Sequence, residues 1–135
     1  MLKTFPSVGV VLIKNRQVLL IVKDNHPQRA YQLPGGQIEP SETPAEAASR
    51  ELEETTGLVS QSKHLIKIPT KWEAIIEKDY GKAIFPFICF ICRDYVGHIK
   101  RTDSATPEWV PLENLDILLL NPNTKNAIDS AVAMD

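Results

Sequence analysis

The segment Gly36–Leu58 constrains this chain more than any other, because a glycine pair there leads into a helix rich in glutamates. Adjacent glycines, here Gly35 and Gly36, let the backbone approach a ligand and adopt dihedral angles closed to other residues. The predicted helix carries carboxylates at Glu51 and Glu54. Such oxygens bind hard divalent cations, which in turn bind phosphates. The segment therefore predicts a site for a phosphorylated small molecule.

Capping residues define the ends of this helix, which is predicted to run from Pro44 to about Thr56. Thr43 and Glu46 have the spacing of a capping box, and proline is favoured at the first helical position. Gly57 is then a natural C-terminal stop. The register of the glutamates on the helix follows from these ends.

Helical geometry decides which side chains share a face. At about 100° per residue, Glu54 lies roughly 60° from Glu51, and Thr55 lies roughly 40° from it on the other side. Glu53 lies at about 200° and is expected to face solvent. The apolar stripe expected to pack on a sheet consists of Ala45, Ala48 and Leu52. One face thus offers two carboxylates and a hydroxyl beside the buried surface.

The spacing of this segment resembles the signature of the Nudix hydrolases. That signature runs Gly, five residues, Glu, seven residues, Arg, Glu, aliphatic, any residue, Glu, Glu, any residue, Gly, aliphatic. Eight of its nine specified positions are filled, by Gly36, Glu42, Arg50, Glu51, Leu52, Glu54, Gly57 and Leu58. The exception is Thr55, where the family usually has the second Glu of a pair, a carboxylate that often helps to hold metal.

The resemblance implies a metal site and a base. Glu51, Glu54 and the carbonyl of Gly36 would hold Mg²⁺, for which Mn²⁺ can substitute. Glu51 is the first candidate for the general base that takes a proton from water. The other candidate bases, which the sequence does not rank, are Glu73, Glu77 and Glu108. Thr55 could still hold a metal-bound water through its hydroxyl, so weaker cation binding is expected.

Arg50 is the predicted positioning residue of the site. In the family this arginine orients the catalytic carboxylate, and the resemblance carries that role to Arg50 with Glu51. The spacing places Arg50 within reach of Glu46 or Glu54 one turn away, and Glu42 could reach it from the loop. The predicted catalytic set is therefore Glu51, Arg50 and Glu54.

Residues before and within the glycine loop are the predicted substrate contacts. Family members often place a basic and an aromatic residue near substrate at this point, which implicates Arg29 and Tyr31 beside Gly35 and Gly36. For Arg29 and Tyr31 the alternative is a solvated cation and a packed ring. Further rings that could stack on a base, but that more often belong to a core, are Trp72, Phe85 and Phe87.

The rest of the chain reads as strands with one more helix. Ser7–Ile13 and Val18–Lys23 are predicted to form a hairpin. Further predicted elements are two strands, or a strand with a loop, over 60–71 and 72–77, strands over 84–92 and 108–110, a turn at 79–82, a helical turn at 111–115 and a helix from 122 or 123 to 133. The resemblance implies an α/β fold, a mixed sheet between helices, in a single domain over residues 1–135.

Composition bounds the partners. The 135 residues are 43% hydrophobic and 24% charged with a net charge of −2, which gives no electrostatic case for a nucleic-acid polymer or a membrane. The first residues lack the apolar stretch of a signal peptide, so a cytoplasmic location is expected. Cys89 and Cys92 lie three apart on a predicted strand and should point to opposite faces as buried thiols. His26, His64 and His98 are expected in loops or at the surface.

The expected activity is that of a MutT-like pyrophosphohydrolase. It would use Mg²⁺ to cleave a pyrophosphate bond in a nucleoside diphosphate linked to another group, with a nucleoside triphosphate or a nucleotide sugar as the first candidates. Thr55 motivates one alternative, a domain of little or no activity that binds a nucleotide as a sensor or regulator. A purely structural domain is the third. Family members often dimerise, so a homodimer is also expected.

Overall fold

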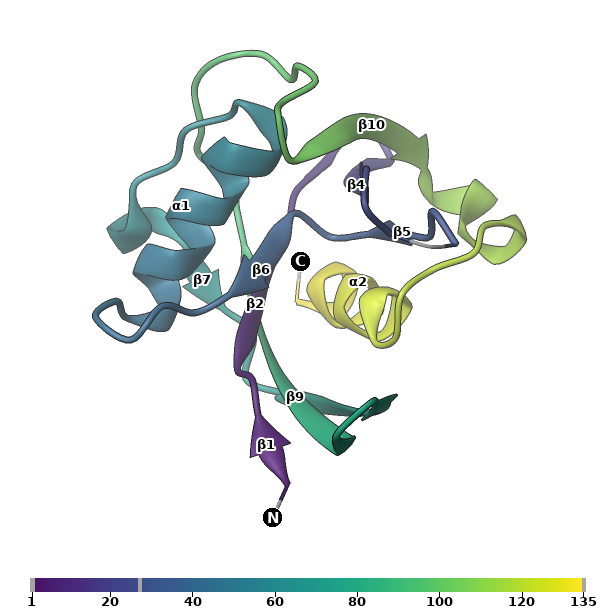
Figure 1. The fold of residues 1–135 in the computed structure, drawn as a ribbon. Coiled ribbons are helices and arrows are strands. Elements are labelled where there is room, and N and C mark those ends of the chain that lie inside the picture. Colours follow the sequence, from purple (N-terminus) through teal and green to yellow (C-terminus); the bar gives the residue numbers. More distant parts are fainter. Residues whose placement is uncertain (1, 27, 135) are drawn as a thin grey trace.

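The computed structural model describes residues 2–26 and 28–134, so Met1, Pro27 and Asp135 lie outside it. The described chain forms two sheets and two α-helices (Figure 1). The larger sheet has six strands, in the order β1-β9-β2-β6, with β7 and β8 also paired to β9. Its strands are β1 (Lys3–Thr4), β2 (Ser7–Val11), β6 (Gly35–Gln37), β7 (Ile66–Lys67), β8 (Trp72–Lys78) and β9 (Gly81–Ile91). β2 runs parallel to β9 and antiparallel to β6, so this sheet is mixed.

The smaller sheet has four strands, in the order β10-β4-β3, with β5 on β4. Its strands are β3 (Ile13–Lys14), β4 (Gln17–Lys23), β5 (Tyr31–Gln32) and β10 (Ala105–Pro111). β10 pairs along the whole of β4, with Glu108 opposite Leu20. The predicted strand over 108–110 is therefore the centre of a longer one.

The predicted hairpin is only partly right. The chain leaves its strand at Leu12, so that β2 enters the larger sheet, and only the short β3 pairs with β4, with Ile13 opposite Val18. Residues 8–12 are buried throughout. A strand that is apolar on both faces carries no alternation that would reveal its partner. The position of the strand could be predicted, and its pairing could not.

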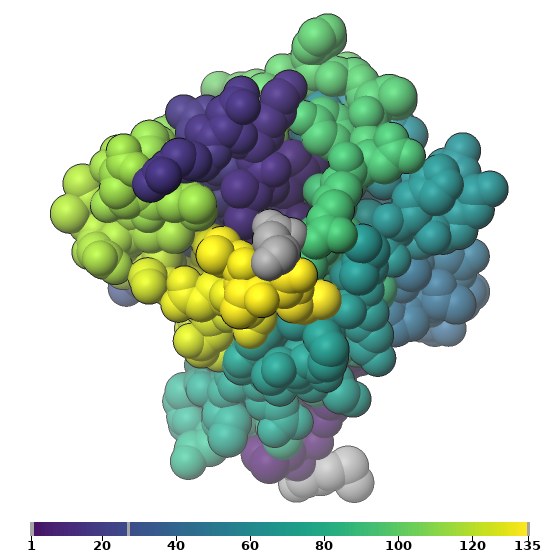
Figure 2. All heavy atoms as spheres, turned by 180° about the vertical axis from the view of Figure 1, so that it is seen from behind, coloured from purple at the N-terminus to yellow at the C-terminus, as the bar shows by residue number. Residues whose placement is uncertain are grey.

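The helices α1 (Pro44–Thr56) and α2 (Thr124–Ala133) cover opposite faces of this framework. Val8 and Val10 of β2 belong to a core cluster with α1, whereas Val11 belongs to a second cluster with Ala127 and Ile128 of α2. Seen from behind, α2 lies between the lime segment that precedes it and the teal β8–β9 hairpin (Figure 2). The predicted α/β arrangement, a mixed sheet between helices, is confirmed.

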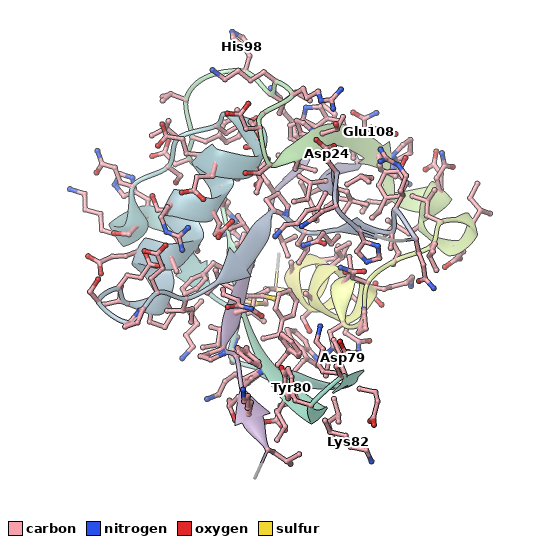
Figure 3. The ribbon with its side chains drawn as sticks, in the orientation of Figure 1. Asp24, Asp79, Tyr80, Lys82, His98 and Glu108 are labelled. Atoms are coloured by element: carbon pink, nitrogen blue, oxygen red, sulfur yellow. The ribbon has the colours of Figure 1, made fainter. Side chains whose placement is uncertain are left out.

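Two 3₁₀ segments, η1 (Ser62–His64) and η2 (Leu112–Ile117), connect the larger elements. The helical turn predicted over 111–115 is η2. Of the two alternatives predicted for 60–77, the strand with a loop is the closer one: β8 is the strand, and 60–71 contains only η1 and the two-residue β7. β8 and β9 extend further toward each other than predicted, so that Asp79 and Tyr80 alone form the turn (Figure 3). The predicted C-terminal helix is α2, whose N-cap is Asn123.

The cysteines occupy different layers. Cys89 belongs to the cluster that contacts α2, and Cys92 belongs to the cluster that contacts α1. Burial raises the pKa of the Cys89 thiol to about 12 and raises that of Cys92 as well. The prediction of buried thiols on opposite faces is confirmed. Within the described residues, none of the helices has the length and apolar character needed to cross a membrane.

Candidate functional site

The ends of α1 are fixed by local hydrogen bonds, as the sequence predicts. The Thr43 hydroxyl accepts from the Glu46 amide at 3.1 Å, and the Glu46 carboxylate accepts from the Thr43 amide at 2.8 Å. Gly57 ends the helix with a φ of 86°, a left-handed conformation that favours glycine. These caps hold α1 in one register and thereby fix the directions of the carboxylates that follow.

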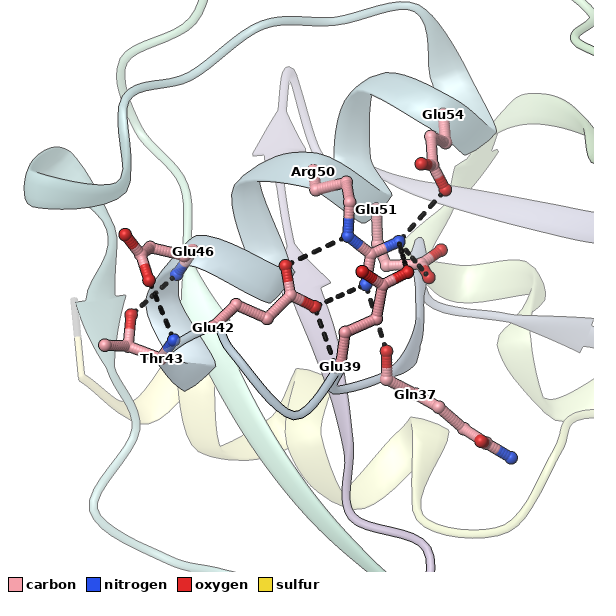
Figure 4. A network of polar contacts seen from close by, with 8 residues as sticks. All are labelled: Gln37, Glu39, Glu42, Thr43, Glu46, Arg50, Glu51 and Glu54. Atoms are coloured by element: carbon pink, nitrogen blue, oxygen red, sulfur yellow. Dashed lines mark hydrogen bonds and ion pairs between the residues drawn. The ribbon is translucent and has the colours of Figure 1, made fainter.

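Arg50 is the centre of an ion-pair network (Figure 4). Its Nε and Nη2 donate to the two oxygens of Glu42, at 3.0 and 2.6 Å. Its Nη1 donates to Oε2 of Glu51 at 3.0 Å and to Oε2 of Glu54 at 3.1 Å. The carbonyl of Gln37 accepts from Nη2 at 3.1 Å, which ties the helix to β6. One guanidinium therefore orients three glutamates of the segment.

The network also shifts the pKa values of Glu42 and Arg50. The hydrogen bond from Arg50 lowers the pKa of Glu42, and the same carboxylate raises the pKa of Arg50. Of the predicted partners, Glu54 and Glu42 contact Arg50, whereas Glu46 serves the helix cap. Spacing alone does not distinguish these glutamates, because a capping glutamate and a salt-bridging glutamate can lie equally far from their partners along a helix.

The glycine pair allows two close approaches. A Cβ at Gly35 would overlap the carbonyl of Val8 on β2, and a Cβ at Gly36 would overlap the carboxylate of Glu51. The Glu51 side chain is only 12% exposed. Burial raises its pKa and Glu54 adds to this, while Lys23 and Arg50 oppose the shift. Glu51 thus lies directly against the glycine loop, partly shielded from water.

Glu51 and Glu54 open into a hollow that we call the carboxylate pocket, about 380 Å³ in volume. It is lined by Lys23, Asp24, Asn25, Glu51, Glu54, Thr55, Asp103 and Ser104. Lys23 and Asp24 come from the end of β4, and Asp103 comes from the loop before β10. Sequence reasoning missed all three. An acid in the polar loop ahead of a strand was the available signal for Asp103, but nothing in the sequence places that loop beside α1.

The carboxylate pocket has the donor chemistry that Mg²⁺ or Mn²⁺ prefers, namely carboxylate and hydroxyl oxygens. Over residues 2–26 and 28–134, no three His, Cys, Asp or Glu side chains are already arranged to hold a metal ion. The contacts with Arg50 explain part of this, since they use Oε2 of both Glu51 and Glu54. The second oxygen of each carboxylate is free of that contact, so the residues present fit a divalent cation.

Thr55 lines the carboxylate pocket but is almost wholly buried, with 1% of its surface exposed. Its hydroxyl donates to the carbonyl of Glu51, one turn earlier, at 2.6 Å. The helical wheel correctly places this residue on the acidic side. The hydroxyl proton is already used within the helix, however, so that only the lone pairs of the oxygen can contact a water molecule.

A second hollow, the apolar cavity, has a volume of about 140 Å³ and is also lined by Gly36. Its walls come from β8 and β9, where Ala74, Ile76, Phe85 and Phe87 contribute side chains. Gln32 and Asn121 add amides. Gly36 therefore has the Glu51 carboxylate beside it and also borders this cavity.

The other predicted contacts lie elsewhere. The hydroxyl of Tyr31 donates to Glu108 at 3.1 Å, and burial, followed by this bond, raises the Tyr31 pKa. Arg29 is exposed in the loop before β5. None of these three described residues lines the carboxylate pocket or the apolar cavity. Figure 3 shows Glu108 on the β4–β10 side of the molecule.

The other candidate bases and rings on β8 and β9 lie on different faces of their strands. Glu73 and Glu77 alternate along β8 with Ala74 and Ile76, so they point away from the apolar cavity that Ala74 and Ile76 line. Phe85 and Phe87 line that cavity, and Trp72 packs against the core. His64 and His98 are exposed, and His26 lies in the loop between β4 and β5, so all three are in loops or at the surface as predicted. His26 is half-buried and hydrogen-bonded to Asn121.

Known proteins place this geometry in a family. The family model for the NUDIX domain matches residues 3–131. The chain belongs to the Nudix family. Among curated Nudix relatives, an ADP-ribose pyrophosphatase of Methanocaldococcus jannaschii is 39% identical over 114 residues, which cover 82% of this chain and 64% of that protein. The match covers about a third of the length of two further relatives.

Solved structures agree on the Nudix fold. A MutT NUDIX hydrolase from Burkholderia pseudomallei superposes with a TM-score of 0.80 at 20% identity, covering 95% of this chain and 98% of that chain. The NUDIX domain of Shewanella oneidensis NrtR, in complex with ADP ribose, gives a TM-score of 0.71 at 20% identity, covering 99% and 90%. The predicted MutT-like fold is confirmed.

Proposed function

We propose that this Nudix protein is a pyrophosphohydrolase that uses a divalent cation, Mg²⁺ or Mn²⁺, to cleave a nucleoside diphosphate linked to another group. The observation that carries the proposal is the position of Glu51, whose carboxylate lies against Gly36, contacts Arg50 and opens into the carboxylate pocket. The relatives support this activity, since one is named a pyrophosphatase and another an RNA pyrophosphohydrolase.

In this proposal, the residues in and around the carboxylate pocket bind the cation, accept a proton or position other side chains. Glu51, Glu54 and the carbonyl of Gly36 would hold the cation, whose charge would neutralise phosphate oxygens and lower the pKa of a bound water. Glu51 would take the proton of the attacking water, because burial raises the pKa of its carboxyl group and makes it a stronger proton acceptor than an exposed carboxylate. Arg50 acts through Glu51 and Glu54 as a positioning residue. Asp103 supplies a carboxylate near Thr55, where the box lacks one.

The apolar cavity supplies the second half of the substrate site. A nucleoside base would lie in it, between the side chains of β8 and β9, while the phosphates cross Gly36 toward the carboxylate pocket. Lys23, the one cation among the described residues that line the carboxylate pocket, would contact the phosphates. A nucleoside triphosphate or a nucleotide sugar remains the first candidate substrate.

One observation favours a second function. Thr55 is buried and its hydroxyl proton is bound within the helix, so the box lacks one acidic ligand. A protein with the same two hollows and little turnover would bind a nucleotide as a sensor. The homodimer and the cytoplasmic location expected from the sequence stay predictions, and light scattering would test the first.

The deciding experiment is release of nucleoside monophosphate, separated by ion-exchange chromatography, from nucleoside triphosphates, nucleotide sugars, ADP-ribose and dinucleoside polyphosphates, with Mg²⁺ or Mn²⁺. Release should require the metal and disappear in Glu54→Gln. Glu53→Gln is the matched control, because Glu53 is exposed on the same helix and lines neither hollow. Absence of turnover together with nucleotide binding by calorimetry would instead support the sensor.

A further inference from the structure

The apolar cavity holds two amide side chains, and their orientation decides which edge of a ligand it accepts. Gln32 comes from β5, and Asn121 comes from the C-terminal strap, residues 118–123 between η2 and α2. The cavity is about 140 Å³, close to the roughly 150 Å³ that suffices for a benzene-sized ring. A flat ring fits between Phe85 and Phe87 and the aliphatic walls, so the amides supply the directional contacts.

His26 sets the direction of the first hydrogen bond. The backbone amide of Gln28 donates to Nδ1 of His26 at 3.1 Å, and a backbone amide can only donate. Nδ1 therefore carries no proton, and the neutral imidazole has its proton on Nε2. Nε2 lies 3.0 Å from Oδ1 of Asn121 and must donate to it.

The same reasoning carries through the two amides. Because the oxygen of Asn121 faces His26, its Nδ2 faces Gln32 and donates to Oε1 at 2.8 Å. The oxygen of Gln32 is thereby used, and its Nε2 carries donors only. A chain of bonds from the Gln28 amide through His26 and Asn121, which we call the amide relay, thus ends at Gln32 with N–H groups.

Main-chain bonds hold the amide relay in place. Tyr31 donates its amide to the carbonyl of Leu119, and Asn121 donates its amide to the carbonyl of Tyr31, both at 2.9 Å. β5 itself pairs with β4, with Gln32 opposite Ile21. The strap and β5 are therefore fixed to each other independently of their side chains, so the donors of Gln32 are preorganised.

We propose that the amide relay selects a base whose edge presents two neighbouring hydrogen-bond acceptors. A 6-oxopurine has this edge in O6 and N7, whereas adenine pairs the acceptor N7 with the donor N6–H₂. An adenine amino group facing the Gln32 donors would leave both sets of N–H groups unpaired. The inference rests on the proposed function in one respect, that the ligand is a nucleotide.

The test is a calorimetric comparison of inosine and adenosine 5′-monophosphate. These ligands lack a pyrophosphate bond, so binding is measured without turnover, and they differ only at position 6 and in the proton that hypoxanthine carries on the neighbouring N1. We expect the wild type to bind the inosine nucleotide about tenfold more tightly, which corresponds to about 1.4 kcal/mol.

Two isosteric variants should remove or reverse this preference. In Asn121→Asp both side-chain oxygens accept, so Gln32 must turn its amide toward Asp and present Oε1 to the cavity, which favours adenosine. Gln32→Glu replaces the donors of Gln32 with a carboxylate oxygen and acts in the same direction. Asn114→Asp, an exposed position in η2, adds the same charge on the same part of the chain and should keep the inosine preference.

The outcomes separate this inference from the proposed function. Equal affinities in the wild type, tighter adenosine binding as the name of the archaeal relative suggests, or no saturable binding of either nucleotide would overturn it. An unchanged preference in both folded variants would also overturn it. Release of nucleoside monophosphate from inosine and adenosine triphosphates, assayed separately, reports on hydrolysis alone, so either result can fail without the other.

Discussion

The two hollows that Gly36 borders are built in different ways. In the carboxylate pocket, Glu51 and Glu54 of one helix are held by ion pairs to a single arginine, and charged side chains from β4 and the loop before β10 complete the lining. In the apolar cavity, side chains from β8, β9, β5 and the strap meet, and hydrogen bonds between neutral groups fix the polar ones. Under the proposed function, the reaction would depend mainly on the short segment around α1, whereas substrate choice would depend on residues scattered along the chain. Changes on the first side should lower kcat, and changes on the second should raise KM.

The largest effect is expected from Glu51→Gln, which keeps the shape of the side chain and removes its charge. We expect kcat to fall by about 10²- to 10⁴-fold with little change in KM, since a general base and a cation ligand are lost together. Steady-state kinetics on the best substrate of the panel would measure this. A rise in KM alone would contradict the assignment of catalysis to the carboxylate pocket and of substrate binding to the apolar cavity.

Gly36→Ala tests the boundary between the hollows. The added Cβ would overlap the Glu51 carboxylate, so either Glu51 or β6 must shift. A displacement of about 1 Å costs about 10²-fold in rate. We expect kcat to fall by that amount while circular dichroism shows a folded protein. Full activity in this variant would mean that Glu51 does not need its contact with the glycine loop.

Gly9→Ala should change the apolar cavity indirectly, through the ring of Phe87 that lines it. A Cβ at this position would lie 2.6 Å from the ring of Phe87, which must then move into the cavity. Overpacking of this kind costs about 1–3 kcal/mol of folding stability. Because the displaced ring would change the shape of the cavity proposed to hold the base, we expect KM to rise about tenfold with kcat nearly unchanged. A fall in kcat equal to that of Gly36→Ala would contradict the distinction between the carboxylate pocket, expected to affect kcat, and the apolar cavity, expected to affect KM.

Glu42, in the ion-pair network of Arg50, should make the folding stability depend on pH. Arg50 lowers its pKa below the usual 4.5, so the folded state binds this proton less tightly than the unfolded state. The stabilisation is present above the unfolded pKa and is lost as pH falls through the folded pKa. We expect Glu42→Gln to cost about 1 kcal/mol at pH 7 and to flatten the loss of stability below pH 4.5. Urea unfolding at several pH values measures both, and a parallel acid limb in the variant would contradict it.

The smallest effect is expected from Thr55→Glu. The new side chain would extend from a buried position into the carboxylate pocket and supply the missing acid. We expect the Mg²⁺ concentration at half-maximal activity to fall a few-fold, because an added carboxylate strengthens binding of a hard cation. Thr55→Gln, of the same length without charge, is the control. An unchanged or weaker Mg²⁺ dependence in the Glu variant would refute the idea that this position limits cation binding.

The contrast between a site built from one short segment and a cavity built from distant segments also explains what the sequence could predict. The helix from Pro44 to Thr56, with Thr43 as its cap, follows from local chemistry, and so do the contacts of Arg50 with Glu42 and Glu54. Asp103 and Asn121 could not be found in this way, since each reaches its pocket through pairing between distant strands or a strap. The failed pairing of β2 with β4 has the same cause, because a strand buried on both faces does not reveal its neighbour.

The attachment of the strap has a consequence for how proteins of this shape diverge. Leu119, Tyr31 and Asn121 are joined through main-chain groups, which every residue except proline provides. Side chains on the strap can therefore be exchanged without loosening it. A lineage could acquire new substrates by altering a few positions far from its chemistry, each step leaving a folded and active intermediate. The strap is thus where related proteins can be expected to differ most in what they select.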